Sequence, residues 1–216
     1  MPISEVYNCD CLEYMRSLPD KHFDLCIADP PYRDAKENQP QYEMRNVGFS
    51  HSLGNKPDQQ MLNEIFRVSK NTIIWGANNF DYPFKGFIAW DKQIRGADRY
   101  SQVEIASLSE GLSTVSKYVS ISCLDKMGKI HPTQKPIALY AWILDNYAKQ
   151  GDKIFDPFLG SGSSRIAAYK KGFDFYACEL DKEYYEAQEE RFRRECLGEI
   201  KLTNGKVAVQ KNLFEL

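Results

Sequence analysis

An acid, two prolines and a tyrosine follow a short apolar run in "DLCIADPPYRD", residues 24–34. Proline has no backbone N–H, so Pro30 and Pro31 remove two donors from the turn, whereas its carbonyls and the Asp29 carboxylate remain as acceptors. Fixed acceptors suit a ligand that donates, such as an exocyclic amino group, and Tyr32 adds a flat face for stacking an aromatic ring. The turn therefore predicts a ligand-binding role, and the alternative is a connection that the prolines merely stiffen.

A second chemical pattern lies in "KIFDPFLGSGSSRIAAYKKGFDFYACELD", residues 153–181, which has the form strand, glycine loop, helix, strand and acid. Gly160 and Gly162 allow a tight turn and close approach of the backbone to a ligand. Glu179 follows 17 residues after Gly162 (179 − 162), where an acid can accept hydrogen bonds from ribose hydroxyls. The loop has no Lys-Ser/Thr grip for terminal phosphates, so it favours a nucleoside without phosphate, such as S-adenosylmethionine. The alternative is an ordinary strand-to-helix turn.

These two patterns need a scaffold that brings them together. In a doubly wound sheet, ligands bind beyond the carboxyl ends of the strands, at the point where strand order reverses. If the strands before Asp29 and Gly160 are neighbours there, the acid faces the nucleoside across one crevice. This arrangement fits methylation of the amino nitrogen of a flipped-out nucleobase.

Apolar runs and helical patterns alternate along the chain, which predicts a mostly parallel α/β sheet. The expected strands are residues 23–28, 71–77, 86–90, 103–109, 152–158 and 173–180. The expected helices are residues 57–70, 135–151, 163–172 and 182–196. The stretch from Trp75 to Ser109 is rich in strand signals without a helix, so we expect one antiparallel hairpin at an edge.

Composition sets the class of protein. The 216 residues predict a single domain, and neither a membrane-spanning segment nor a signal peptide is expected, which predicts a cytoplasmic protein. The six cysteines form no CxxC pair, so we expect reduced thiols and no metal. The net charge of −2 does not favour a nucleic-acid partner, but residues 124–136 carry several cations and are either a basic face or an ordinary solvated loop.

The chain resembles the permuted, beta-type amino-group DNA methyltransferases, the DPPY-containing N6-adenine and N4-cytosine methylases, in which the catalytic motif precedes the cofactor motif. "DLCIADPPY" is similar to the catalytic motif, "IFDPFLGSGSS" to the cofactor glycine loop and "FYACELD" to the ribose-binding strand end. "IHPTQKP" and "YNCDCLEYMRSLPDKHFD" resemble two further cofactor segments. The resemblance covers nearly the whole chain and implies a doubly wound, mostly parallel, seven-stranded Rossmann-like sheet.

The resemblance also implies roles for single residues. Asp29 and the Pro30 carbonyl would hold the target amino group, Pro31 would shape the turn and Tyr32 would stack on the base. Around S-adenosylmethionine, it implies a cofactor set with Asp10 and the Cys11 amide at the adenine, Glu179 and Leu180 at the ribose, and Thr133 and Lys135 near the methionine carboxylate. Asp29 would also belong to this set, and the glycine loop would complete it with Asp156, Phe158, Gly160, Ser161 and Gly162.

The implied activity is methyl transfer from S-adenosylmethionine to the N6 amino group of adenine in double-stranded DNA, without a metal. Members with Asp before Pro-Pro-Tyr mostly act on adenine, but the turn itself also fits the N4 amino group of cytosine. A non-catalytic module that binds nucleic acid or cofactor is the alternative from another class.

One departure from the family pattern concerns DNA recognition. The target-recognition region near residues 108–130 is short, and the long polar loop at residues 33–58 is expected to be a mobile segment that faces DNA. Specific protein–DNA interfaces bury about 1,000–2,500 Å², so we expect a second copy of the chain or a partner subunit to enlarge the surface. A cognate restriction nuclease is a further candidate partner.

Overall fold

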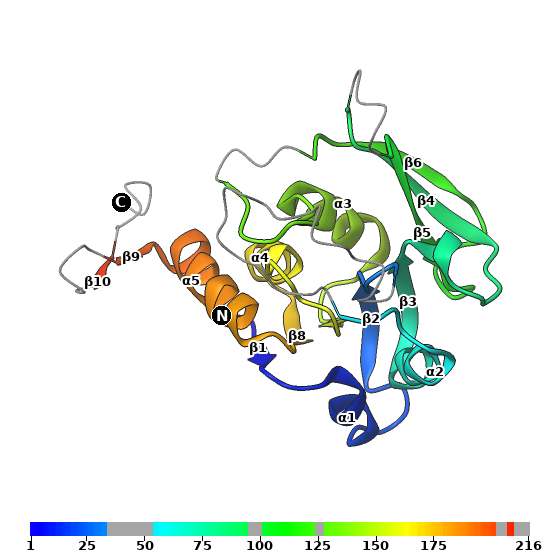
Figure 1. Ribbon diagram of the computed structural model, residues 1–216, viewed down its shortest axis with the longest axis horizontal. Coiled ribbons are helices and arrows are strands. Elements are labelled where there is room, and N and C mark those ends of the chain that lie inside the picture. Colours follow the sequence, from blue (N-terminus) through cyan, green and yellow to red (C-terminus); the bar gives the residue numbers. More distant parts are fainter. Residues whose placement is uncertain (34–53, 95–100, 124–127, 202–206, 210–216) are drawn as a thin grey trace.

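The computed structural model describes residues 1–33, 54–94, 101–123, 128–201 and 207–209. Within these residues, eight strands form one sheet with helices on both faces (Figure 1). The strands are β1 (Ser4–Tyr7), β2 (Phe23–Ala28), β3 (Ser69–Trp75), β4 (Gly86–Asp91), β5 (Val103–Leu108), β6 (Lys117–Ser120), β7 (Lys153–Asp156) and β8 (Asp174–Cys178). The predicted doubly wound α/β fold is confirmed.

Four of the helices in the described residues fall close to the patterns that predict them, and the helix at Cys11–Arg16 is not among those expected. The helices are α1 (Cys11–Arg16), α2 (Gln59–Val68), α3 (Ile137–Tyr147), α4 (Ser163–Lys170) and α5 (Lys182–Leu197), with a short 3₁₀ turn, η2 (Ala77–Asn79). Asp58, rather than the expected Pro57, begins α2, because its carboxylate accepts a hydrogen bond from the Met61 amide over 2.8 Å. A hairpin of β9 (Glu199–Lys201) and β10 (Val207–Val209) follows α5.

The strand order is β1-β8-β7-β2-β3-β5-β4-β6. From β1 to β3 every neighbouring pair is parallel, whereas β5 is antiparallel to both β3 and β4. The expected hairpin is therefore present, with β5 rather than β4 against the parallel strands. Within the described residues the sheet has eight strands and not seven, because β6 adds a short parallel edge beside β4.

The core lies on both faces of the sheet, as expected for continuous apolar strands. On β2, Leu25 and Ile27 pack in the cluster beneath α3 and α4, whereas Cys26 and Ala28 pack in the cluster beneath α1 and α2. Successive side chains of β2 point to opposite faces of the sheet, and both faces are buried. Polar residues are therefore poorly tolerated in the strand before Asp29.

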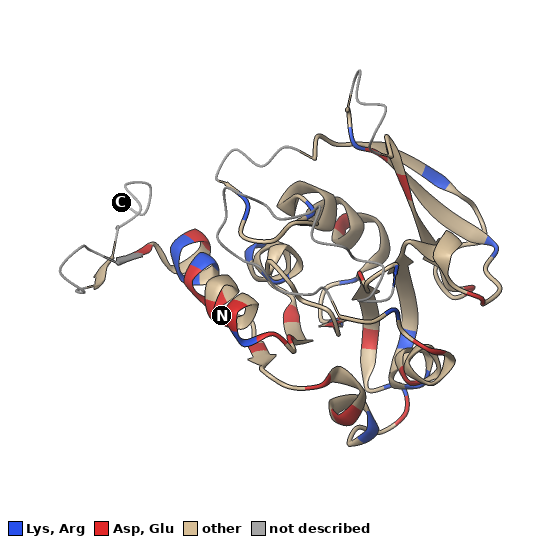
Figure 2. Cartoon of the chain, in the orientation of Figure 1, with Lys and Arg blue, Asp and Glu red and all other residues tan. Residues whose placement is uncertain are grey.

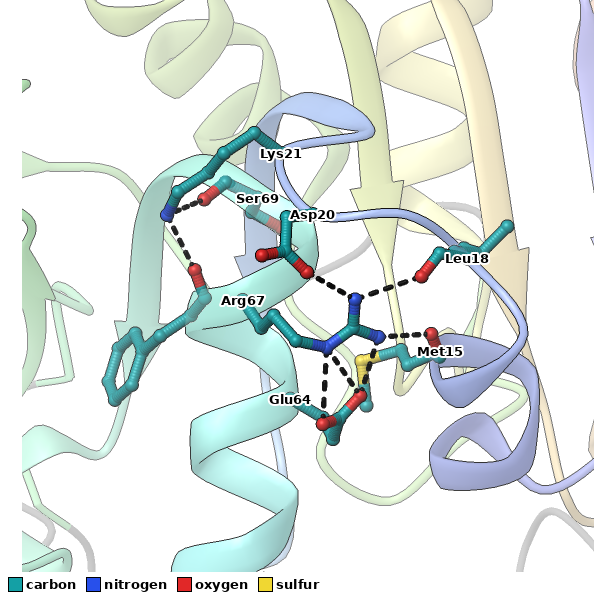
Figure 3. Close-up of polar contacts among 8 residues, drawn as sticks. Met15, Leu18, Asp20, Lys21, Glu64, Arg67 and Ser69 are labelled. Atoms are coloured by element: carbon teal, nitrogen blue, oxygen red, sulfur yellow. Dashed lines mark hydrogen bonds and ion pairs between the residues drawn. The ribbon is translucent and has the colours of Figure 1, made fainter.

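Arg67 joins α1 to α2 at the amino end of β2 and β3 (Figure 3). Its guanidinium donates to the carbonyls of Met15, at 2.7 Å, and Leu18, at 2.9 Å, and to the carboxylates of Asp20 and Glu64. These residues, here called the Arg67 cluster, close the end of the sheet opposite to Asp29. The partly exposed Arg67 side chain thereby donates to two carbonyls at and just beyond the carboxyl end of α1.

Among the described residues, basic and acidic residues are interspersed (Figure 2). Figure 2 shows both signs along α5, where Lys182 and Glu186 form an exposed (i, i+4) ion pair. In the part of the chain that the structure describes, no helix is long and apolar enough to cross a bilayer.

Candidate active site

The two chemical motifs meet because β2 and β7 are parallel neighbours at the centre of the sheet. Leu25 pairs with Ile154 and Cys26 with Phe155. Because the carboxyl ends of parallel strands share one edge, Asp29 after β2 and the glycine loop after β7 emerge side by side. The predicted juxtaposition is confirmed.

The turn after β2 is held through one oxygen of Asp29. The Tyr32 hydroxyl donates to Asp29 Oδ1 over 2.8 Å, and the Lys135 ammonium lies 2.6 Å from the same atom. Among the described residues, no donor contacts Asp29 Oδ2. Pro30 is buried, and the Asp29 side chain retains 14% exposure. The turn therefore fixes one oxygen of its carboxylate, and the other has no donor among the described residues.

Lys135 is shared between two acids. Its side chain is 4% exposed, and its ammonium also lies 3.1 Å from Glu104 Oε2 and donates to the Tyr32 oxygen over 3.1 Å. Glu104 in turn forms an ion pair with Lys92 through Oε1. We call Asp29, Tyr32, Lys92, Glu104 and Lys135 the Lys135 cluster. Its two carboxylates and two ammonium groups balance in charge.

The two acids of the cluster differ electrostatically. Burial raises the pKa of the Asp29 carboxyl, and the Lys135 ammonium only partly offsets this effect. Burial also acts on Glu104, but Lys135 and Lys92 together lower the pKa of that carboxyl below its usual value. Glu104 contacts two cations and Asp29 only one, which explains the difference. The pKa of Asp29 is thus shifted upward and that of Glu104 downward from their ordinary values.

The Tyr32 ring packs against the backbone of the 3₁₀ turn that follows β3. Gly76 has a φ of +67°, and a Cβ at this position would lie 2.3 Å from a ring carbon of Tyr32. Phe80 contacts the same ring edge-to-face, with the centroids 6.4 Å apart. The ring is therefore placed beside the acid, and close backbone approach requires glycine at position 76.

The glycine loop has the backbone conformation that its sequence predicts. Gly160 and Gly162 adopt φ values of +53° and +74°. The Glu179 carboxylate accepts from the Gly160 amide over 2.7 Å and from the Asp181 amide over 2.9 Å, one bond to each oxygen. Burial raises the pKa of Glu179, although these two amides oppose the effect. Glu179 therefore joins the end of β8 to the loop that follows β7.

Asp156 anchors the other side of this loop. Its carboxylate accepts from the Ser164 hydroxyl over 2.6 Å and from the Phe158 amide over 3.0 Å. Burial raises the pKa of Asp156 to about 7. Ser161 is buried, and its carbonyl accepts from the Arg191 guanidinium of α5 over 2.8 Å. These contacts assign to Asp156 and Ser161 the shaping of the loop, and the cofactor contacts expected of them stay predictions.

The segment after β1 lies beside the end of β8. The Asn8 side chain donates to the carbonyls of Glu179, at 2.8 Å, and Leu180, at 3.2 Å. Asp10 begins α1, and its carboxylate accepts from the Leu12 amide over 2.7 Å. Cys11 is buried in the first turn of that helix, and Leu180 is exposed. The structure thus brings the expected adenine and ribose residues together at one edge.

The segment that contains Thr133 and Lys135 contacts both the glycine loop, through His131, and the Asp29 turn, through Lys135. The His131 ring lies 3.5 Å from the position that a Gly160 Cβ would take, and it packs on Tyr184 at 4.4 Å between centroids. Thr133 is exposed, with its hydroxyl 3.2 Å from His131 Nδ1. Lys135, expected near a methionine carboxylate, lies against Asp29 instead, and its role toward a cofactor stays a prediction.

This placement limits the basic-face interpretation of residues 124–136. Lys135 is buried, and burial lowers the pKa of His131 to about 4. Neither adds a solvated charge for DNA at neutral pH. Residues 124–127, and residues 34–53 of the expected DNA-facing loop, lie outside the described part of the chain.

The sequence interpretation does not include Glu104 and Lys92 among the site residues. Glu104 stands in an apolar strand, "VEIASL", where a single acid gives no motif. It reaches the site because β5 runs antiparallel to β3, so its first residues lie where the parallel strands end. Only the strand order, which the sequence does not reveal, brings it to Asp29.

The curated proteins that resemble this chain include two type II methyltransferases. The type II methyltransferase M2.DpnII of Streptococcus pneumoniae is 30% identical over 132 residues, which are 60% of this chain and 44% of that protein. M.HpaI of Haemophilus parainfluenzae is 23% identical over 88% of this chain and 74% of its own length. The chain thus aligns with less than half of the first relative and about three quarters of the second.

Solved structures share the fold. The complex of M1.HpyAVI with SAM has a TM-score of 0.58 at 20% identity and covers 87% of this chain and 98% of its own. The cytosine-N4-specific PvuII DNA methyltransferase has a TM-score of 0.60 at 15% identity, covering 89% and 87%. Residues 64–190, more than half of the 216-residue chain, match the family described as DNA methylase (N6_N4_Mtase). The chain therefore belongs to the N6/N4 DNA methylase family.

Proposed function

We propose that this chain transfers a methyl group from S-adenosylmethionine to the N6 amino group of adenine in double-stranded DNA. The observation that carries the proposal is the Asp29 turn. One of its carboxylate oxygens is fixed by Tyr32 and Lys135, the other faces no donor among the described residues, and the glycine loop emerges beside it. Family membership supports the same reaction class.

The edge beside β7 and β8 suits a nucleoside without phosphate. The Gly160 amide donates to one oxygen of the Glu179 carboxylate and the Asp181 amide to the other. A carboxylate oxygen can accept two hydrogen bonds, so the group keeps capacity for ribose hydroxyls. Gly160 and Gly162 give this loop its left-handed backbone, with the His131 ring packed beside the first glycine and the Gln188 side chain beside the second. When bound there, S-adenosylmethionine would supply a methyl carbon on a positively charged sulfur. The amino nitrogen would form a bond to this carbon as the carbon–sulfur bond breaks, leaving S-adenosylhomocysteine, and the nitrogen would then lose a proton.

Asp29 prepares the amino group for this attack. Its free oxygen accepts one amino hydrogen, which turns the nitrogen lone pair out of conjugation with the base. Its negative charge balances the positive charge that develops on the nitrogen. Tyr32 packs its ring beside the acid and supplies a stacking face for the flipped base.

N4-methylation of cytosine is the second candidate. An acceptor turn binds either amino group, and the PvuII enzyme, which shares the fold, is named as specific for cytosine N4. Adenine is proposed because Asp, rather than Ser, precedes Pro-Pro-Tyr at position 29. For partners, we propose double-stranded DNA with a second copy of the chain or a restriction nuclease, and for compartment the cytoplasm, where DNA and the cofactor occur.

The test is the identity of the product. Purified protein is incubated with DNA and S-adenosylmethionine, and the DNA is digested to nucleosides for mass spectrometry. N6-methyladenine is expected, N4-methylcytosine alone would transfer the proposal to cytosine, and no methylated nucleoside would refute it.

Asp29→Ala is expected to abolish transfer while calorimetry still detects cofactor binding. Asp29→Asn keeps an acceptor without the charge and should retain a small residual rate. An active Asp29→Ala protein would remove the acid from the mechanism.

A further inference from the structure

We propose that Glu104 is a positioning residue of the catalytic turn. Through the Lys135 ammonium it fixes Asp29 Oδ1 and leaves Asp29 Oδ2 free to accept a hydrogen bond from the amino group. This role rests on the proposed methyl transfer and adds to it a residue outside the recognised motifs.

The first step of the argument is the donor count of Lys135. An ammonium group has three N–H donors. Three acceptors lie around it, namely Asp29 Oδ1 at 2.6 Å, Glu104 Oε2 at 3.1 Å and the Tyr32 oxygen at 3.1 Å. With a side chain 4% exposed, Lys135 has little access to water. Its orientation is therefore determined by these acceptors, of which Glu104 is the one outside the turn.

The second step concerns the rigidity of Glu104. It lies on β5, where Ala106 pairs with Trp75, and the Gly76 amide donates to the Ile105 carbonyl over 2.8 Å. Its other oxygen is bound by Lys92, which follows β4. A strand residue held between two cations is a fixed point, whereas Asp29 and Tyr32 belong to a turn.

The third step is the consequence of losing Glu104. One N–H of Lys135 would then lose its acceptor in a buried place, which is costly. The other carboxylate that contacts this ammonium belongs to Asp29. Lys135 would then bind both Asp29 oxygens, and the oxygen needed for the amino group would be occupied. Glu104 thus keeps the Lys135 ammonium on Asp29 Oδ1 and away from Asp29 Oδ2.

The experiment compares Glu104→Met, which removes the acceptor, with Glu104→Gln, which keeps an oxygen without the charge. Glu110→Gln is the matched control, because Glu110 follows the same strand and forms an exposed ion pair with Lys85 at 2.8 Å. We expect Glu104→Met to lower kcat at least about tenfold, with the KM values for DNA and cofactor within about twofold. Glu104→Gln should recover part of the loss, and Glu110→Gln should match the wild type.

A second readout does not need activity. The ¹⁵N signal of the Lys135 ammonium, assigned with Lys135→Arg, should be sharp in the wild type because a buried, fully bonded ammonium exchanges slowly. Glu104→Met should shift or broaden it, and Glu110→Gln should not. If Glu104→Met does not fold, Glu104→Gln carries both measurements, with a smaller loss of kcat expected.

An unchanged kcat in folded Glu104 variants, a loss confined to KM, or an unchanged Lys135 signal would overturn the inference. A wild-type protein without methyl transfer would instead refute the proposed function, and the ammonium signal would still report whether Glu104 holds Lys135.

Discussion

Two groups of charged residues lie at opposite ends of β2 and β3 and differ in almost every property. The Arg67 cluster is partly solvated, with the arginine side chain 28% exposed, and its cation binds main-chain carbonyls as well as acids. The Lys135 cluster is less exposed, and its buried lysine, 4% exposed, binds two acids and a phenol. The first group connects helices, and the second connects a turn to a strand.

This difference indicates which cluster belongs to stability and which to chemistry. Carbonyl groups near a helix end need donors in any folded protein, and Arg67 donates to two of them and to the carboxylates of Asp20 and Glu64. Two carboxylates that share one buried ammonium raise the cost of folding, since a desolvated ion pair is seldom worth its desolvation. Such an arrangement at the carboxyl ends of parallel strands is typical of a functional site.

The largest effect is expected from Lys135→Met. Two carboxylates would then face each other without their shared cation, and breaking a buried pair costs about 3–5 kcal/mol. Asp29, whose pKa burial already raises, should take up a proton, and transfer should fall by about a hundredfold or more. Urea denaturation measures the loss of stability, and initial rates measure the loss of transfer. If both stability and rate stayed within error of the wild type, the Lys135 cluster would not have the functional role that distinguishes it from the Arg67 cluster.

Arg67→Ala should affect stability alone. It removes charged hydrogen bonds to the Met15 and Leu18 carbonyls and should lower the free energy of unfolding by about 2–3 kcal/mol. The specific activity of the folded fraction should stay within about twofold. Arg67→Lys is the control, because it keeps the charge but not the forked geometry and should recover only part of the stability. A folded Arg67→Ala protein with impaired catalysis would show that the two ends are coupled.

The two ends should also respond to pH in opposite directions. Burial raises the pKa of Asp156 from 3.8 to about 7, so its contribution to stability is complete below pH 3.8 and is lost as pH rises through 7. The hydrogen bond from Arg67 lowers the pKa of Glu64 from 4.5, so its contribution is present above pH 4.5 and is lost as pH falls below that value.

Matched variants measure this contrast. The stability of the wild type relative to Asp156→Asn should fall by up to about 1.4 kcal/mol per pH unit between pH 4 and 7. Relative to Glu64→Gln it should instead rise as pH increases from about 3 to 5. A flat difference for Asp156→Asn across its window would show that its carboxyl titrates normally.

The smallest effect is expected from Tyr32→Phe. The ring and its packing on Gly76 remain, but Asp29 Oδ1 loses one of its two donors. A hydrogen bond worth about 1 kcal/mol corresponds to a loss of about fivefold in kcat. Tyr32→Ala, which also removes the stacking face, should lose about 1–3 kcal/mol more in transfer. Equal rates for the two variants would show that the ring does not contact the base.

The sequence predicts the parts of this molecule whose chemistry is local. Prolines without donors, glycines at positive φ and an acid after an apolar strand are readable within about ten residues, and the structure places the Asp29 turn and the glycine loop together as expected. Helix positions follow from apolar spacing, and their ends shift where a cap such as Asp58 competes with a proline.

The partners of Asp29 are not readable in the same way. Lys135 lies 103 residues from Tyr32, and Glu104 lies 72 residues from it. Their meeting depends on β5 entering the sheet antiparallel beside β3, and alternation of apolar residues does not specify a neighbour. The sequence also does not predict the eighth strand. The four residues of β6 are too polar to give a strand signal, although they pair with β4 at the edge of the sheet.

The pairing of β2 with β7 also determines when the site can form during synthesis. The Lys153 amide donates to Asp24 over 2.9 Å across 129 residues, so the centre of the sheet closes only after most of the chain has left the ribosome. At about 5–20 residues per second, the Asp29 turn then waits several seconds or more for its cofactor strand. High contact order slows the closure further. In a growing chain, the edge of β2 that later pairs with β7 consequently stays unpaired during this interval, and an unpaired apolar strand edge is prone to aggregation.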